Sequence, residues 1–195
     1  MVGEKTPSRF SIVTLIDALP IVLIIAYAAL GYFTGVLRRI IGLLSLYVAC
    51  IAATGMGLQA GGLIQQATGA ETPDARIFGF FGVLIVVIVG IDGAAQLAHK
   101  QIQIEAIVWN RLSGVIVGIV TALLLSIVLV YELQAAASPS GGGEIAGTQA
   151  TIRDTVNGSH FAVPVVNAIS KPVIAVFQPV LPGDPHQYFS RGPVT

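Results

Sequence analysis

Long apolar stretches alternate with short polar ones along the first part of the chain. Four of them run over residues 12–33, 40–58, 77–98 and 112–131. Each is close to the roughly 20 apolar residues that a helix needs to cross the hydrocarbon core of a bilayer. Asp17 and Pro20 interrupt only the beginning of the first stretch, where a helix tolerates proline. The pattern therefore predicts an all-α membrane protein with four transmembrane helices.

The pattern changes after Tyr131. Residues 134–143 are rich in Ala, Ser, Pro and Gly, which predicts a flexible linker between a transmembrane domain of residues 1–133 and a C-terminal segment of residues 144–195. That segment is a Pro/Gly-rich extension with apolar pieces too short to span a membrane, because four prolines divide it: Pro164, Pro172, Pro179 and Pro182. We expect short helical pieces that lie at the interface, re-enter the membrane or dock on a partner, and these alternatives stay open.

Composition and charge support the membrane interpretation. Hydrophobic residues make up 54% of the chain and charged residues 10%, whereas soluble domains carry about 25% charged residues. Ten basic and ten acidic residues give a formal net charge of zero, so no positive field attracts nucleic acid. Membrane lipids are therefore the expected surroundings, and nucleic acid is not an expected partner.

Residues that could carry chemistry are few and scattered. The single cysteine, Cys50, lies in an apolar run, where it excludes an intrachain disulfide and is expected to pack as a small hydrophobic residue. His99, His160 and His186 stand in three different regions without the spacing of metal ligands. The chain has no Walker A, G-x-S-x-G or H-E-x-x-H motif. We expect no cofactor, no metal site and no enzymatic activity.

Glycines recur at helical spacing in the first and fourth stretches. Gly31 and Gly35 form one G-x-x-x-G pattern, and Gly114 and Gly118 form another. Association of helices in lipid depends on small residues that let two backbones approach closely. The four glycines are therefore predicted to form helix–helix packing surfaces. The third stretch adds four more glycines to the membrane region: Gly79, Gly82, Gly90 and Gly93.

An ionisable residue within a span is costly and is a candidate functional residue. Asp92, near the end of the third stretch, could bind a cation, pair with a basic residue or carry a proton. The alternative is a position near the interface, with hydration or a hydrogen bond to a neighbour such as Gln96. Asp17 is interpreted as a helix-start residue at the interface, where a carboxylate favours the positive end of the helix dipole.

The distribution of Lys and Arg near the spans predicts the orientation in the membrane. The connections after the first and third helices carry Arg38, Arg39, Lys100 and Arg111, whereas Lys5, Arg9 and Arg76 flank the spans on the other side. This balance favours cytoplasmic first and third connections and extracytoplasmic termini. Arg38, Arg39 and Arg111 are thus interpreted as topology signals or as contacts to lipid headgroups.

Three stretches carry a family resemblance. Asp17 precedes the segment GYFTGVLRRIIGLL (residues 31–44), NRLSGVIVG follows at residues 110–118, and a tail with a serine and scattered prolines covers residues 159–182. In this order and spacing they resemble the colicin V production protein (CvpA) family of bacterial inner-membrane proteins. Asn110 stands where that family usually has an aspartate, which puts any role of the charge at that position in doubt.

The resemblance implies a multi-pass protein of a bacterial inner membrane, linked to colicin V production and envelope maintenance or stress tolerance. Related four-helix modules anchor extracytoplasmic serine proteases. We therefore expect a non-enzymatic membrane scaffold or accessory subunit that binds other membrane-protein subunits or an envelope protein through its helices and C-terminal tail. The alternative is a small homo-oligomeric transporter or channel that uses Asp92.

Overall fold

The computed structural model describes residues 13–98, 107–140 and 147–191, and this part of the chain contains helices and no strand. In order, the helices are α1 (Val13–Thr34), α2 (Val36–Thr68), α3 (Thr72–Ala98), α4 (Ile107–Ala137), α5 (Gly147–Asn157), α6 (Ala162–Phe177) and α7 (Pro185–Tyr188). The first four are long and apolar enough to cross a membrane. The predicted all-α membrane fold with four transmembrane helices is therefore confirmed.

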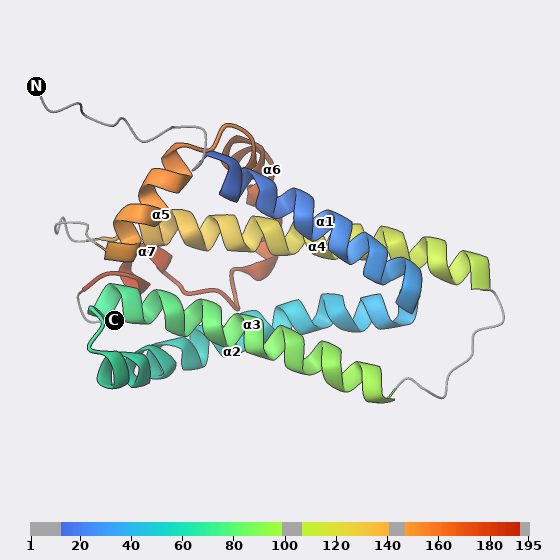
Figure 1. The fold of residues 1–195 in the computed structure, drawn as a ribbon, viewed down its shortest axis with the longest axis horizontal. Helices are drawn as coiled ribbons and strands as arrows, with labels where there is room; N and C mark the ends of the chain where they lie inside the picture. Colours follow the sequence, from blue (N-terminus) through green and yellow to red (C-terminus); the bar gives the residue numbers. More distant parts are fainter. Residues whose placement is uncertain (1–12, 99–106, 141–146, 192–195) are drawn as a thin grey trace, which may run out of the picture.

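The four long helices form one elongated bundle (Figure 1). α1 packs along α4, α2 packs along α3, and α4 also contacts α2. The turn from α1 to α2 lies at the same end as the start of α4, and we call this the junction end. The turn from α2 to α3 lies at the opposite end, together with α5 and α7, and α1 begins on that side of the bundle but further in, near α6 (Figure 1). We call residues 147–191, which begin at that opposite end, the C-terminal cap.

The helices extend beyond the apolar stretches that predict them. α2 continues to Thr68, where Gly69 at φ 70° ends it by donating its N–H to the carbonyl of Gln65. α4 continues to Ala137, because alanine is the best helix former, and Ala136 is fully buried. The first residues of the predicted linker 134–143 are thus the end of α4. Residues 141–143 of that linker lie outside the described residues.

The C-terminal cap shares the hydrophobic core of the bundle. One cluster of buried side chains joins α2, α3 and α4 and includes Leu46, Phe80 and Val128. Buried cap residues belong to the same cluster, namely Phe177, Val180, Leu181, Tyr188 and Phe189. Burial of these apolar side chains is favourable, and it holds the cap against the transmembrane helices.

Large apolar side chains cover the outside of the long helices. Val22 and Ile25 of α1 are 61% and 64% exposed, and Val86 of α3 is 70% exposed. A soluble protein rarely exposes such a continuous apolar surface. On a membrane-spanning bundle this surface faces lipid, which is as apolar as the side chains themselves.

Candidate functional site

The carboxylate of Asp17, in the second turn of α1, holds the start of α6. Its Oδ1 accepts hydrogen bonds from Ser159 Oγ at 2.5 Å, from the Ala162 amide at 2.8 Å and from the Phe161 amide at 3.2 Å. Its Oδ2 accepts the His160 amide at 3.2 Å. The first amides of a helix have no partner within it, and here a neighbouring helix supplies one. Asp17 therefore ties the C-terminal cap to α1.

Ser159 completes this arrangement from the other side. Its hydroxyl donates to Asp17 and accepts the amide of Val163 at 3.1 Å, so it caps the first turn of α6 itself. The residue at the usual capping position is Phe161, whose side chain cannot accept a hydrogen bond. From the sequence, Asp17 is predicted to be a helix-start residue at the interface, without a partner. The structure gives it a partner in the distant tail.

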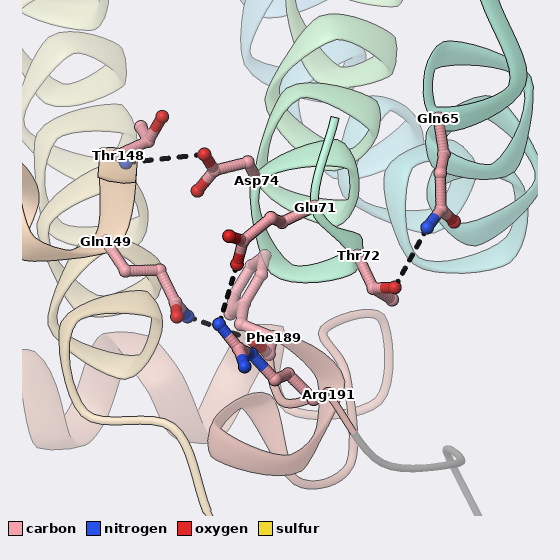
Figure 2. Close-up of polar contacts among 8 residues, drawn as sticks. All are labelled: Gln65, Glu71, Thr72, Asp74, Thr148, Gln149, Phe189 and Arg191. Carbon is pink, nitrogen blue, oxygen red and sulfur yellow. Dashed lines mark hydrogen bonds and ion pairs between the residues drawn. The ribbon is translucent and has the colours of Figure 1, made fainter. Parts of the chain in front are cut away.

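A second tie joins the cap to the start of α3. The Asp74 carboxylate accepts the amide of Thr148 at 3.3 Å, next to Gly147, which begins α5 at φ 62° (Figure 2). Gln149 of α5 donates to the carbonyls of Ala136 and Phe189, each at 3.1 Å. One buried amide thus joins the end of α4, α5 and the residue after α7.

An ion pair lies beside this second tie. The Arg191 guanidinium contacts the Glu71 carboxylate at 2.6 Å, with both side chains more than half exposed (Figure 2). Glu71 precedes α3 and Arg191 follows α7, so the pair joins the end of the cap to the turn between α2 and α3. Water screens such an exposed pair, so it adds little to the stability of the cap.

Aromatic side chains form the third tie. Tyr188 and Phe189 pack edge-to-face on Phe80 of α3, each with a centroid distance of 5.7 Å. The Tyr188 hydroxyl donates to the carbonyl of Ala53 at 3.2 Å. Burial, and after it the nearby Glu132 carboxylate, raises the pKa of the Tyr188 hydroxyl. Tyr188 thus enters the bundle between α2 and α3 as a neutral hydrogen-bond donor.

Arg76 of α3 supports the same residues. Its Nη1 donates to the carbonyl of Ser190, beyond α7, at 2.6 Å and to that of Tyr188, the last residue of α7, at 3.2 Å. From the sequence, Arg76 is predicted only to be a basic residue that flanks a span. A cation at the last carbonyls of a helix is favourable, so this arginine positions the end of the cap.

Glu132 is a buried acid that the sequence pattern did not predict. Its side chain is 0% exposed, and neither carboxylate oxygen has a hydrogen-bond partner among the described residues. The apolar stretch that predicts the fourth helix ends at Tyr131, so Glu132 fell just outside it. The continuing run of helix-forming residues after Glu132 was the available signal that the helix goes on.

The glycines predicted to pack helices lie at the contact between α1 and α4. A Cβ atom added to Gly31 would overlap the carbonyl of Gly114, and one added to Gly118 would overlap the carbonyl of Tyr27. Gly35 has φ 78°, a conformation that favours glycine, and it lies against Asn110. The structure thus brings all four predicted glycines to one seam.

The glycines of α3 differ from one another. Gly79 lies against the backbone of Gly57 and Gly61 in α2. No described atom lies within 4 Å of a Cβ added to Gly82, Gly90 or Gly93. Among the described residues, close packing of α3 through glycine is therefore seen at Gly79 and not at the other three.

Asn110 caps the start of α2 from α4. Its Oδ1 accepts the amide of Val36 at 2.9 Å, directly after Gly35, whose residue type offers no side-chain cap. An amide oxygen accepts this hydrogen bond as a carboxylate would. The departure from the usual aspartate at position 110 therefore keeps the cap and removes its charge.

Asp92 and Arg39 lie near one another inside the junction end. A Cβ added to Gly42 would be 3.3 Å from Asp92 Oδ1 and 4.0 Å from Arg39 Nη1. In the described part of the chain no ion pair joins the two residues, and Arg39 Nη1 is buried without a hydrogen-bond partner. The side chain of Gln96, the neighbour predicted for Asp92, lies outside the described residues.

The arginines of the junction end take different positions. Arg39 is 2% exposed, with Nε donating to Thr34 Oγ1 at 3.2 Å and its guanidinium 5.6 Å from the centre of the Tyr27 ring. The side chain thus points into the bundle and not toward headgroups, and its interpretation as a topology signal stays a prediction. Arg38 is half-buried, and Arg111 is exposed with its guanidinium over the Tyr32 ring.

The remaining candidate side chains have structural surroundings. Cys50 is fully buried in the core. The Nδ1 atom of His186 lies 2.7 Å from the carbonyl of Ser138, and His99 lies outside the described residues. No group of three or more His, Cys, Asp or Glu side chains in the described ranges is arranged to hold a metal ion.

A family match includes most of the residues described above. The model of the family described as colicin V production protein matches residues 16–170. The chain belongs to the colicin V production protein (CvpA) family. No curated protein and no solved structure matches it. The matched range includes both places where motif residues meet, Asp17 with Ser159 and Gly35 with Asn110.

Proposed function

We propose that this CvpA family protein is a non-enzymatic membrane scaffold or accessory subunit that presents its C-terminal cap to another membrane subunit or an envelope protein. The observation that carries the proposal is the fixed position of the cap. Side chains of α1 and α3 hold the starts of α6 and α5, and Tyr188 and Phe189 enter the bundle core. A surface ordered before binding loses less conformational entropy when a partner docks.

The exposed surface of α5 and α7 in the cap is polar. Arg153 and Asp154 of α5 and His186 of α7 are exposed, as are Glu71 and Arg191. Mixed charges of this kind are typical of the rim of a non-obligate interface, where they provide specificity and faster association. The expected partner is therefore a folded protein surface of mixed charge.

We also propose that the protein lies in a bacterial inner membrane with the cap on the extracytoplasmic side. The arginines of the junction end support this orientation, because basic connections favour the cytoplasm. Labelling of intact cells with a membrane-impermeant maleimide tests this orientation. In a Cys50→Ala background, a cysteine at the exposed Thr151 of α5 is expected to react, and one at the exposed Trp109 of α4 is not. The reverse result would place the cap in the cytoplasm.

Co-purification tests the scaffold role. Deletion of residues 144–195 would remove core side chains and could unfold the protein. Substitutions on the exposed surface test partner binding without that effect. Arg153→Glu changes the exposed cap, and Trp109→Ala is the matched control at the junction end. We expect stoichiometric partners, identified by mass spectrometry after mild detergent extraction, to be lost with Arg153→Glu and retained with the control. A protein that always purifies alone would contradict the proposal.

A second candidate is a small transporter or channel, which the surroundings of Asp92 favour. Its carboxylate lies in the bundle beside Gly42, and the buried Arg39 guanidinium has an unpaired Nη1 nearby. This candidate predicts ion or proton flux in proteoliposomes that Asp92→Asn reduces. Absence of flux in the wild-type protein would eliminate it.

A further inference from the structure

α6 runs across the bundle instead of along it. Its axis turns by 92° from that of α5, and Figure 1 shows α6 crossing the direction of α1 and α4. Its start is held by Asp17, in the second turn of α1, and its buried side packs Val166 against Ile127 and Val130 of α4. α6 is therefore placed at the level where the apolar part of α1 begins.

The side chains of α6 divide into three sides. One side is buried against the bundle, with Ala162, Val166 and Phe177. A second side, which we call the apolar edge, is exposed and recurs at intervals of four and seven residues: Phe161, Val165, Ile169 and Val176. A third side, which we call the polar edge, is exposed and carries Asn167, Lys171 and Gln178. At about 100° per residue, the two edges lie on opposite flanks of the buried side.

A pocket shows which way the polar edge faces. Lys171 and Gln178 line a pocket of about 360 Å³ together with Tyr131 and Gly183. The same pocket is lined by Leu181 and Pro182, and the chain leads from them to α7 at the outer end of the bundle (Figure 1). The polar edge therefore faces the outer end of the bundle, and the apolar edge faces its middle.

The surface next to the apolar edge is already apolar. Ile21, Val22 and Ile25 of α1 are each at least half exposed, and they lie from one to two turns further into the bundle than Asp17. The exposed apolar surface of the spanning helices thus continues onto α6. A partner covering the apolar edge would have to match this continuous surface, as acyl chains do without any specific contact.

We propose that α6 is an in-plane membrane helix that lies at the boundary between headgroups and acyl chains on the cap side of the bilayer. Its apolar edge contacts phospholipid acyl chains, and Lys171 extends along its stem toward the headgroup phosphates. The bound occupant is thus the lipid of this leaflet. Asp17 fixes the depth of the helix, because it joins the start of α6 to a fixed turn of a spanning helix. The proposal does not depend on the scaffold role.

Two single-tryptophan variants test the proposal in proteoliposomes of the full chain. In a Trp109→Phe background, Ile169→Trp places the probe on the apolar edge, and Asn167→Trp places it on the polar edge two residues away. Both positions are exposed, so neither substitution enters the core. Unchanged far-UV circular dichroism and unchanged protease resistance of the cap verify that α6 stays docked.

The quenchers are lipids brominated high on the acyl chain and aqueous iodide. The tryptophan at position 169 is expected to lose fluorescence with brominated lipid, to resist iodide and to emit at shorter wavelength than the one at position 167, which iodide quenches. Quenching of the position 169 probe by iodide alone would put the apolar edge in water. Protection from both quenchers would show that protein covers it, a partner or a second copy, and either result overturns the proposal.

Discussion

At both ends of the bundle a helix begins with amides that another helix must supply with an acceptor, and the two acceptors differ in charge. At the junction end α2 begins after Gly35, and at the cap end α6 begins after Phe161; neither residue can cap its helix. Asn110 of α4 supplies one neutral acceptor to α2, whereas Asp17 of α1 supplies a carboxylate that accepts four hydrogen bonds at the start of α6. The neutral cap fixes a turn between adjacent helices, and the charged cap holds a distant segment onto the bundle.

The ends also differ in what fills the space between helices. Toward the junction end, α1 and α4 approach through glycine, so that the backbones of Gly31 and Gly114 touch. At the cap end, large rings occupy the space, with Phe80, Tyr188 and Phe189 in mutual contact. Backbone contact tolerates no added atom, whereas side-chain packing allows some rearrangement. Substitutions should therefore act most strongly at the glycine seam.

Gly31→Ala is the substitution with the largest expected effect. The added methyl group would overlap the Gly114 carbonyl, so we expect a loss of about 3 kcal/mol in the free energy of unfolding. Unfolding by SDS in mixed micelles, followed by circular dichroism, measures the change. Gly90→Ala is the matched control because its Cβ meets no described atom, and alanine there is expected to be neutral or slightly stabilising. Equal losses of unfolding free energy for the two variants would contradict close backbone packing at Gly31.

Asp17→Ala should have the next largest effect, and it should act locally. The change leaves the Ser159 hydroxyl and three amides without their acceptor, which corresponds to about 2 kcal/mol. Hydrogen exchange at the amides of residues 160–162 is expected to accelerate, while exchange in the middle of α2 stays slow. Asp154→Ala, which removes an exposed carboxylate from α5, should change neither. Unaltered exchange in the Asp17 variant would show that the carboxylate does not hold α6.

Asn110 variants sharpen the comparison between neutral and charged caps. Asn110→Ala removes the acceptor for the Val36 amide and should reduce the free energy of unfolding by about 1 kcal/mol. Asn110→Asp keeps an acceptor and places a negative charge at the start of α2, so it should be at least as stable as wild type. The same SDS titration compares the two. An aspartate variant as unstable as the alanine variant would mean that the junction end does not tolerate a charge.

Glu71→Gln should have the smallest effect. The ion pair with Arg191 is more than half exposed, so its loss should change the free energy of unfolding by less than about 0.5 kcal/mol. A double-mutant cycle with Arg191→Gln, at low and at high salt, isolates the pair and should show coupling that fades with salt. Coupling above about 1 kcal/mol would give this pair a larger part in holding the cap than its exposure allows.

The sequence determined the membrane fold because a spanning helix must satisfy its backbone internally and present about 20 apolar residues to lipid, and that requirement is visible locally. The four spans and the glycine spacing were therefore predictable. A cap supplied by another helix leaves no local pattern in the sequence. The contacts of Asp17 with Ser159 and of Asn110 with Val36 were therefore not predictable. The burial of Arg39 and Glu132 likewise depends on which face of a helix meets its neighbours. Only the tertiary structure decides that, because helices that are apolar on all sides carry no periodic signal for their inner face.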